Sequence, residues 1–207
     1  FEAAAGITIT YLTSYHALVQ RANIQPGETL LVLGAAGGVG STAVELGKAL
    51  GATVIAAASS DDKLALCTEL GADHVINYSD ESLKDRVKEL TGGAGVDVVY
   101  DPVGGDFSEP AVRSMGWKGR YLVIGFASGP IPSIPLNLTL LKGCSIVGVF
   151  WGRFTMEETE VHLANIDTLW QWFEEVKIKP VITDLFPIEE YEGAYAAMME
   201  RRAKGKV

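Results

Sequence analysis

The chain has 207 residues, 48% of them hydrophobic and 21% charged, with 17 basic against 26 acidic residues and a net charge of −9. This composition is typical of a globular protein with a buried core and excludes disorder, while the negative charge disfavours nucleic acid or an anionic membrane as a partner. No apolar run approaches the roughly 20 residues that a membrane helix needs. The two cysteines, Cys67 and Cys144, are too few for a disulfide scaffold and suggest reduced thiols in a cytoplasmic protein.

Hydrophobic periodicity predicts alternating strands and helices along most of the chain. The strands, which are short apolar runs, are expected at 29–33, 53–58, 74–78, 96–100, 120–124 and 145–150. The helices, which show apolar residues at helical spacing, are expected at 7–22, 39–50, 61–70, 80–90 and 107–115. Strands joined by crossover helices run parallel, and continuously apolar strands are covered on both faces. The predicted fold class is therefore α/β, with a doubly wound parallel six-stranded Rossmann sheet.

The pattern changes near residue 151. Residues 127–135 form a proline-rich loop, and the later segment predicts one long helix at 157–177, a strand-like piece at 180–187 and a helix at 188–202. We therefore expect a dinucleotide-binding domain with a leading helix at 1–154 and a helical tail at 155–207. Phe1 is not a start residue and the chain breaks off at Gly205-Lys206-Val207, as though a strand were beginning, so we expect a piece of a longer protein.

A glycine-rich turn at 34–40 connects the first predicted strand to the following helix, in the context that a dinucleotide fingerprint requires. Gly37 would let a pyrophosphate approach the backbone, and Gly40 would let the helix press against the strand. The amides at the helix start would bind the phosphates. The first fingerprint position is occupied by Ala35, with Gly34 just before it. Within this turn, the cofactor-binding candidates are Ala36, Gly37, Gly38 and Val39.

Further candidates follow the other strands, because ligands of such sheets bind at the carboxyl ends of the strands. They are Ser59, Ser60, Tyr78, Val103, Gly104, Gly125, Phe126, Phe150 and Trp151. The alternative for Gly104 and Gly125 is that they only form turns. Asp101 is expected to orient a loop rather than to act as a general base.

Position 60 decides which dinucleotide is favoured. An acidic residue about 20 positions beyond the fingerprint would bind the ribose hydroxyls of NAD, but Ser60 stands there. Ser60 can donate to a 2′-phosphate, Lys63 can supply a positive charge, and Tyr78 can add a hydroxyl. These residues favour NADP (NADPH). The neighbouring Asp61 and Asp62 leave NAD as an open alternative.

Several short runs occur together in a fixed order along almost the whole chain. They are 12–18 (LTSYHAL), 26–28 (PGE), 34–40, 70–73 (LGAD), 96–101 (VDVVYD), 119–120 (GR) and 205–207 (GKV). This set resembles the zinc-independent quinone oxidoreductase branch, the zeta-crystallin-like group, of the medium-chain dehydrogenases/reductases. The resemblance implies an NADP-binding Rossmann domain and a GroES-like catalytic domain, most of which would precede residue 1. The tail at 155–207 would lead back toward that domain.

The same resemblance suggests where other parts of the site lie. It places Thr13 near the nicotinamide, with the loop at Phe126 and the backbone at Phe150 and Trp151 lining the nicotinamide pocket. It implies no metal, and the three histidines have no metal-ligand spacing. It also implies a homodimer formed through the edge of the sixth strand, an apolar edge that would otherwise be exposed.

The expected reaction is hydride transfer from NADPH to a quinone or another conjugated carbonyl, which is a small-molecule electron acceptor. Catalytic residues are not identified in this sequence, and this portion alone is not expected to be active. One alternative is an enoyl- or acryloyl-CoA reductase that uses the same donor. Another is a nucleotide-binding structural or sensor protein without turnover, because the fold does not determine the function.

Overall fold

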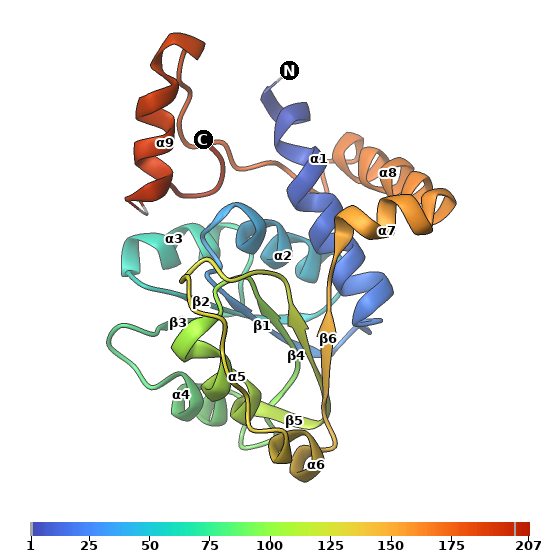
Figure 1. The fold of residues 1–207 in the computed structure, drawn as a ribbon, viewed down its shortest axis with the longest axis vertical. Helices are drawn as coiled ribbons and strands as arrows, with labels where there is room; N and C mark the ends of the chain where they lie inside the picture. The colour runs from blue at the N-terminus through green and yellow to red at the C-terminus, as the bar shows by residue number, and fades with distance from the viewer. Residues whose placement is uncertain (1, 201) are drawn as a thin grey trace.

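The computed structural model describes residues 2–200 and 202–207 and contains one parallel sheet in the order β3-β2-β1-β4-β5-β6 (Figure 1). All neighbouring strands in this sheet pair in parallel. The strands are β1 Thr29–Leu33, β2 Thr53–Ala58, β3 His74–Asn77, β4 Val96–Asp101, β5 Met115–Val123 and β6 Ser145–Gly148. The predicted doubly wound Rossmann sheet is confirmed, and its order reverses between β1 and β4.

Alternate residues of the strands enter two separate cores, one on each face of the sheet. Leu30 and Val32 join the core formed with helices α1, α2, α3 and α8, whereas Leu31 and Leu33 join the core formed with α4, α5 and α6. These helices are α1 Glu2–Tyr15, α2 Gly38–Ala49, α3 Asp61–Glu69, α4 Leu83–Leu90, α5 Ser108–Ser114, α6 Asn137–Lys142 and α8 Thr159–Glu174. Figure 1 shows the two helical layers on opposite sides of the sheet.

The leading helix is longer than predicted and changes its winding. After Tyr15 it continues as a π-helical segment, His16–Arg21. The His16 ring stacks on Phe154 with ring centroids 3.8 Å apart, and the Tyr15 ring meets Trp172 of α8 edge-on at 5.7 Å. The leading helix and α8 therefore pack side by side, as Figure 1 also shows.

The helix predicted at 157–177 is found as α8, Thr159–Glu174, which begins two residues later and ends three residues earlier, and the short helix before it was not predicted. Helix α7, Trp151–Glu157, ends at Glu158, whose backbone (φ −128°, ψ 51°) leaves the helical region before α8 begins. The break lets Phe154 pack on His16 while Leu169 of α8 is buried in the core below. Two other differences are that β5 begins at Met115 rather than at 120, and that α6 was not predicted.

The end of the chain returns to the sheet domain. The predicted strand at 180–187 forms only one isolated parallel bridge, between Ile182 and Lys206. The expected last helix is a short 3-10 turn, Ile188–Glu190, followed by α9, Tyr191–Met199. Figure 1 shows α9 standing away from the sheet, whereas the Gly205 N–H, near the chain end, donates to the Ala36 carbonyl just after β1. The domain boundary near residue 155 stays a prediction. Leu169 and Ile178, which follow that boundary in the sequence, share a core with α1 and β1.

In the described part of the chain, no helix combines the length and the apolar character needed to cross a bilayer.

Candidate functional site

The glycine-rich turn between β1 and α2 is shaped by close backbone contacts. Gly34 has φ +58°, a left-handed conformation that favours glycine, and its carbonyl accepts a hydrogen bond of 2.9 Å from the Gly37 N–H. A Cβ atom on Gly40 would lie only 2.2 Å from the Gly34 oxygen. The prediction that Gly40 allows close helix–strand packing is confirmed. Gly34, rather than Ala35, makes the tight bend.

The start of α2 is suited to bind an anion. Gly37, in extended backbone conformation, is the N-cap, and no side chain of the described residues caps the helix there. The first turn also contains no acidic residue. Amides at a helix start carry partial positive charge, and glycines let a phosphate reach them. The turn at Gly37, Gly38 and Val39 therefore fits the diphosphate of a dinucleotide.

The turn lies at the point where the strand order reverses. A Cβ atom on Gly34 would be 2.8 Å from a methyl group of Val103, which follows β4. The loops after β1 and β4 are therefore in contact. Ligands of doubly wound sheets bind at such a point, next to the carboxyl ends of the strands.

Asp101 orders the loop after β4. Its carboxylate is 2% exposed and accepts hydrogen bonds from the N–H groups of Val103 (2.7 Å) and Gly104 (2.8 Å) and from the Ser108 hydroxyl (2.9 Å). Tyr121 donates to the same carboxylate. Burial, followed by the charge of Asp101, raises the pKa of Tyr121. Asp101 is thus fully engaged in positioning the loop, which is the role expected of it.

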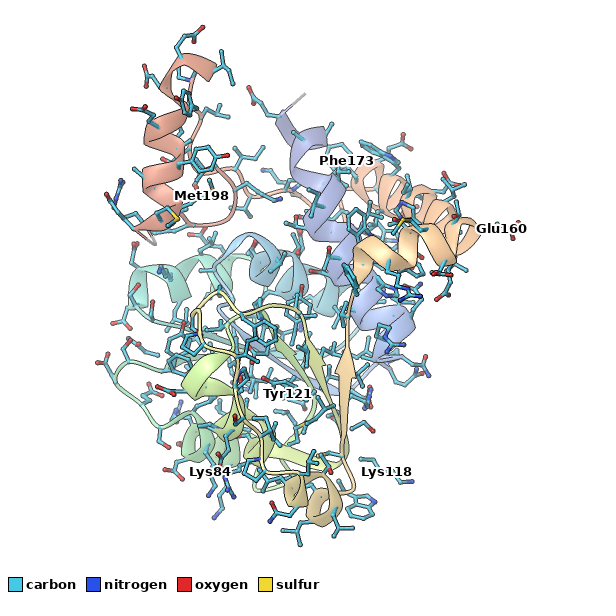
Figure 2. The ribbon with its side chains drawn as sticks, in the orientation of Figure 1. Lys84, Lys118, Tyr121, Glu160, Phe173 and Met198 are labelled. Carbon is cyan, nitrogen blue, oxygen red and sulfur yellow. The ribbon has the colours of Figure 1, made fainter. Side chains whose placement is uncertain are left out.

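The loop after β5 closes against the loop after β4. A Cβ atom on Gly104, which has φ +70°, would meet the Phe126 ring at 2.9 Å, so this glycine is required by packing as well as by the turn. Tyr121, labelled in Figure 2, contributes to an apolar cavity of about 150 Å³ in this region. The cavity also has contributions from Asp101, Val123, Gly125, Phe126, Ile131, Pro132, Ile134 and Ile146.

The residues predicted to bind the adenosine end lie together after β2 and β3. The Lys63 ammonium lies 3.4 Å from the Ser59 hydroxyl, and the Ser79 hydroxyl donates to the Ser59 carbonyl at 2.9 Å. The Tyr78 ring packs on Phe107 with centroids 4.4 Å apart. Ser60 is the N-cap of α3. The structure therefore brings Ser59, Ser60 and Lys63 together, with the Tyr78 backbone nearby, since its N–H donates to the Ala58 carbonyl at 3.1 Å.

The leading helix is held against the turn by buried hydroxyls. The Ser14 hydroxyl is hydrogen-bonded to those of Thr42 (2.8 Å) and Tyr100 (2.7 Å) and donates to the Val39 carbonyl at 3.2 Å. Burial raises the pKa of Tyr100, so its hydroxyl remains protonated. Thr13, next to Ser14, is half-buried. This network fixes the helix that carries Thr13 relative to the phosphate turn.

The two aromatic candidates after β6 are less closely tied to the rest. Phe150 is 73% exposed, and Trp151 begins α7 rather than ending a strand, with its ring edge-on to His162 at 5.7 Å. Within the described residues, no ring contact joins Phe126 to Phe150 or Trp151. The place of the Phe126 loop and of the backbone at 150–151 in the nicotinamide pocket stays a prediction.

Sequence reasoning missed the contact between the chain end and the turn. The Gly205 N–H donates to the Ala36 carbonyl at 2.8 Å. Around the place of a Cβ on Gly38 lie the Gly205 carbonyl at 3.4 Å, Thr10 at 3.9 Å and the Lys206 side chain at 4.0 Å. Burial lowers the pKa of Lys206. No local pattern predicts this docking, because it joins segments far apart in the sequence.

No metal centre is found in residues 2–200 and 202–207, where no three His, Cys, Asp or Glu side chains gather in a position to hold an ion. The described residues therefore do not fit a zinc site, and we derive no chemistry through one.

The sheet order and the turn define a Rossmann domain of the dinucleotide-binding class. A family model described as zinc-binding dehydrogenase matches residues 38–167, more than half of the chain. The chain therefore belongs to this family, and the relatives that it matches include quinone oxidoreductases.

Individual relatives agree with this assignment. Quinone oxidoreductase-like protein 2 of Bos taurus is 42% identical over 99% of this chain, which spans 59% of that protein. The quinone oxidoreductase of Thermus thermophilus, solved also in complex with NADPH, has a TM-score of 0.87 and 34% identity over all of this chain and 65% of its own. CurK enoyl reductase has a TM-score of 0.86 and 28% identity, over 98% of this chain and 60% of its own. The chain thus spans about three fifths of these proteins.

Proposed function

We propose that the protein is an NADPH-dependent oxidoreductase that reduces a quinone or another conjugated carbonyl, and that this chain binds the cofactor. The observation that carries the proposal is the start of α2, which no side chain of the described residues caps and where Gly37 and Gly38 are only partly buried. The family assignment and the NADPH complex of the Thermus thermophilus relative support the identity of the ligand.

Each part of the site has a separate task in this proposal. Gly37, Gly38 and Val39 would bind the diphosphate through backbone amides, and Ser60 and Lys63 would bind the 2′-phosphate. Asp101 would hold the Val103–Gly104 loop beside the cofactor. When bound, NADPH supplies a hydride, and a proton from solvent or from the rest of the protein completes the reduction of the acceptor.

The experiment is an acceptor screen with the full-length protein, in which loss of the reduced-nicotinamide absorbance is followed with quinones and with enoyl-CoA esters. Turnover of NADPH with a quinone supports the proposal. Reduction of enoyl-CoA esters alone would favour the second candidate, an enoyl reductase, which the similarity to CurK enoyl reductase suggests. Tight NADPH binding without turnover of either acceptor class would contradict both enzymatic proposals.

We also propose that the protein forms a homodimer through β6, acts without zinc and is cytoplasmic. β6 is the outermost strand of the sheet, and Ile146 on it is 39% exposed, so its open edge can pair with a second copy. Both cysteines are free and buried, in keeping with a reducing compartment. Light scattering on Ile146→Asp should show a monomer where the unchanged protein shows a dimer. A monomer for both would contradict the dimer.

A further inference from the structure

Two carboxylates stand close to the place proposed for the 2′-phosphate. Asp61 and Asp62 form the first turn of α3, directly after Ser60. With only Lys63 to oppose them, they would give this end of the site a net negative charge. A phosphate group would then be repelled, because charges a few ångströms apart interact strongly at a protein surface.

The structure shows that both carboxylates have partners. The Asn77 amide, 7% exposed, donates to Asp61 at 3.0 Å and to Asp80 at 2.9 Å, which directs Asp61 toward the end of β3. Asp62 forms an ion pair with Lys204. The exposed fractions of the two side chains are 75% for Asp62 and 32% for Lys204.

Lys204 comes from the end of the chain, and its position is set by the surrounding backbone. Its neighbour Gly205 donates to the Ala36 carbonyl in the phosphate turn at 2.8 Å, and the Lys206 N–H donates to the Val181 carbonyl at 2.8 Å. Thr183 donates to the carbonyl of Lys204 itself. The backbone next to Lys204 is therefore hydrogen-bonded to the phosphate turn and to the segment that forms the Ile182–Lys206 bridge.

We propose that Lys204 is a specificity-determining residue, which offsets the charge of Asp62 and adds a second cation beside Ser60 and Lys63, so that the site accepts a 2′-phosphate. This inference rests on the proposed function, since it concerns the same cofactor site. It assigns to the chain end a role in choosing NADPH over NADH. It also explains how NADPH can bind although Asp61 and Asp62 lie next to the place proposed for its 2′-phosphate.

The test is calorimetric titration of the full-length protein with NADPH and NADH, using Lys204→Ala, Lys204→Arg, Asp62→Asn and the Lys204→Ala/Asp62→Asn double variant. Lys204→Ala should weaken NADPH binding about three- to tenfold and change NADH binding less than about twofold, as expected for one partly exposed charge near a phosphate. Lys204→Arg should keep the preference, because the charge remains. Asp62→Asn should restore most of the NADPH affinity in the Lys204→Ala background.

The matched control is Lys179→Ala, which replaces a lysine of the same tail whose backbone N–H, not its side chain, contacts Glu45. It should leave both affinities unchanged. Equal weakening of NADPH and NADH by Lys204→Ala would overturn the inference and leave Lys204 a structural tether, and so would no change in either affinity. If the unchanged protein binds neither coenzyme, the proposed function fails instead, so the two failures are distinguishable.

Discussion

The two ends of the candidate cofactor site are built in different ways. The phosphate turn at 34–40 is one continuous piece of backbone whose shape depends on glycines. The adenosine end is assembled from side chains of separate segments, with Ser60 and Lys63 after β2, Tyr78 after β3 and Lys204 from the chain end. We therefore expect the first region to determine whether a dinucleotide binds, and the second to determine which one.

The largest effect is expected at Gly40. In Gly40→Val the new Cβ would collide with the Gly34 carbonyl, 2.2 Å away, and neither atom belongs to a flexible side chain. We expect a loss of about 3 kcal/mol in the free energy of unfolding, as for severe overpacking. Urea unfolding measures it. The matched control is Gly148→Ala, because a Cβ there meets no atom within 4 Å. A Gly40→Val protein as stable as the control would contradict the close packing of helix on strand.

The next effect separates binding from folding. Gly37→Val would fill the space in front of the α2 amides, while its Cβ would make a tight contact of 3.3 Å with the Gly34 oxygen that a small local shift relieves. NADPH and NADH affinities should both fall about a hundredfold, corresponding to the loss of several charge-assisted hydrogen bonds. Calorimetry measures both. If only one coenzyme were affected, the turn would not be the shared diphosphate site.

A smaller and selective effect is expected at the adenosine end. Lys63→Ala should weaken NADPH about tenfold, as expected for one charge-assisted contact, and leave NADH nearly unchanged. The control is Lys84→Ala. Lys84, labelled in Figure 2, is an exposed lysine on α4, which covers the face of the sheet opposite to the α3 helix that carries Lys63. An equal loss of affinity for both coenzymes would contradict the proposal that Lys63 binds the 2′-phosphate.

The smallest effect concerns an ion pair at the other end of the sheet, away from both regions. Burial alone would raise the pKa of Glu28, but hydrogen bonds from Arg120 and Gln25 and the charge of Arg120 hold it below its usual 4.5. The pair therefore stabilises the fold above pH 4.5, and this contribution is lost as the pH falls through the lowered pKa. Glu28→Gln should reduce stability by about 1 kcal/mol at neutral pH, without changing coenzyme binding. If the free energies of unfolding of Glu28→Gln and of the unchanged protein still differ as much below the lowered pKa of Glu28, the ion pair is not the cause.

The sequence was informative where one local pattern determines the structure. The parallel sheet with helices on both faces follows from alternating apolar runs and crossover helices, and Gly40 lies within a turn whose context is local. The prediction failed where tertiary packing decides. Helix α7, which places Phe154 on His16, was not predicted, and no proline or glycine marks its end at Glu158. The contact of Gly205 with Ala36 joins distant segments that no spacing rule relates.

The most direct test of the account is calorimetric titration of the well-folded full-length protein with NADPH and then with NADH. We expect saturable binding of both, with NADPH bound more tightly through the contacts proposed for Ser60, Lys63 and Lys204 with its additional phosphate. A folded protein that releases no heat with either coenzyme would contradict the claim that the turn at 34–40 binds a diphosphate.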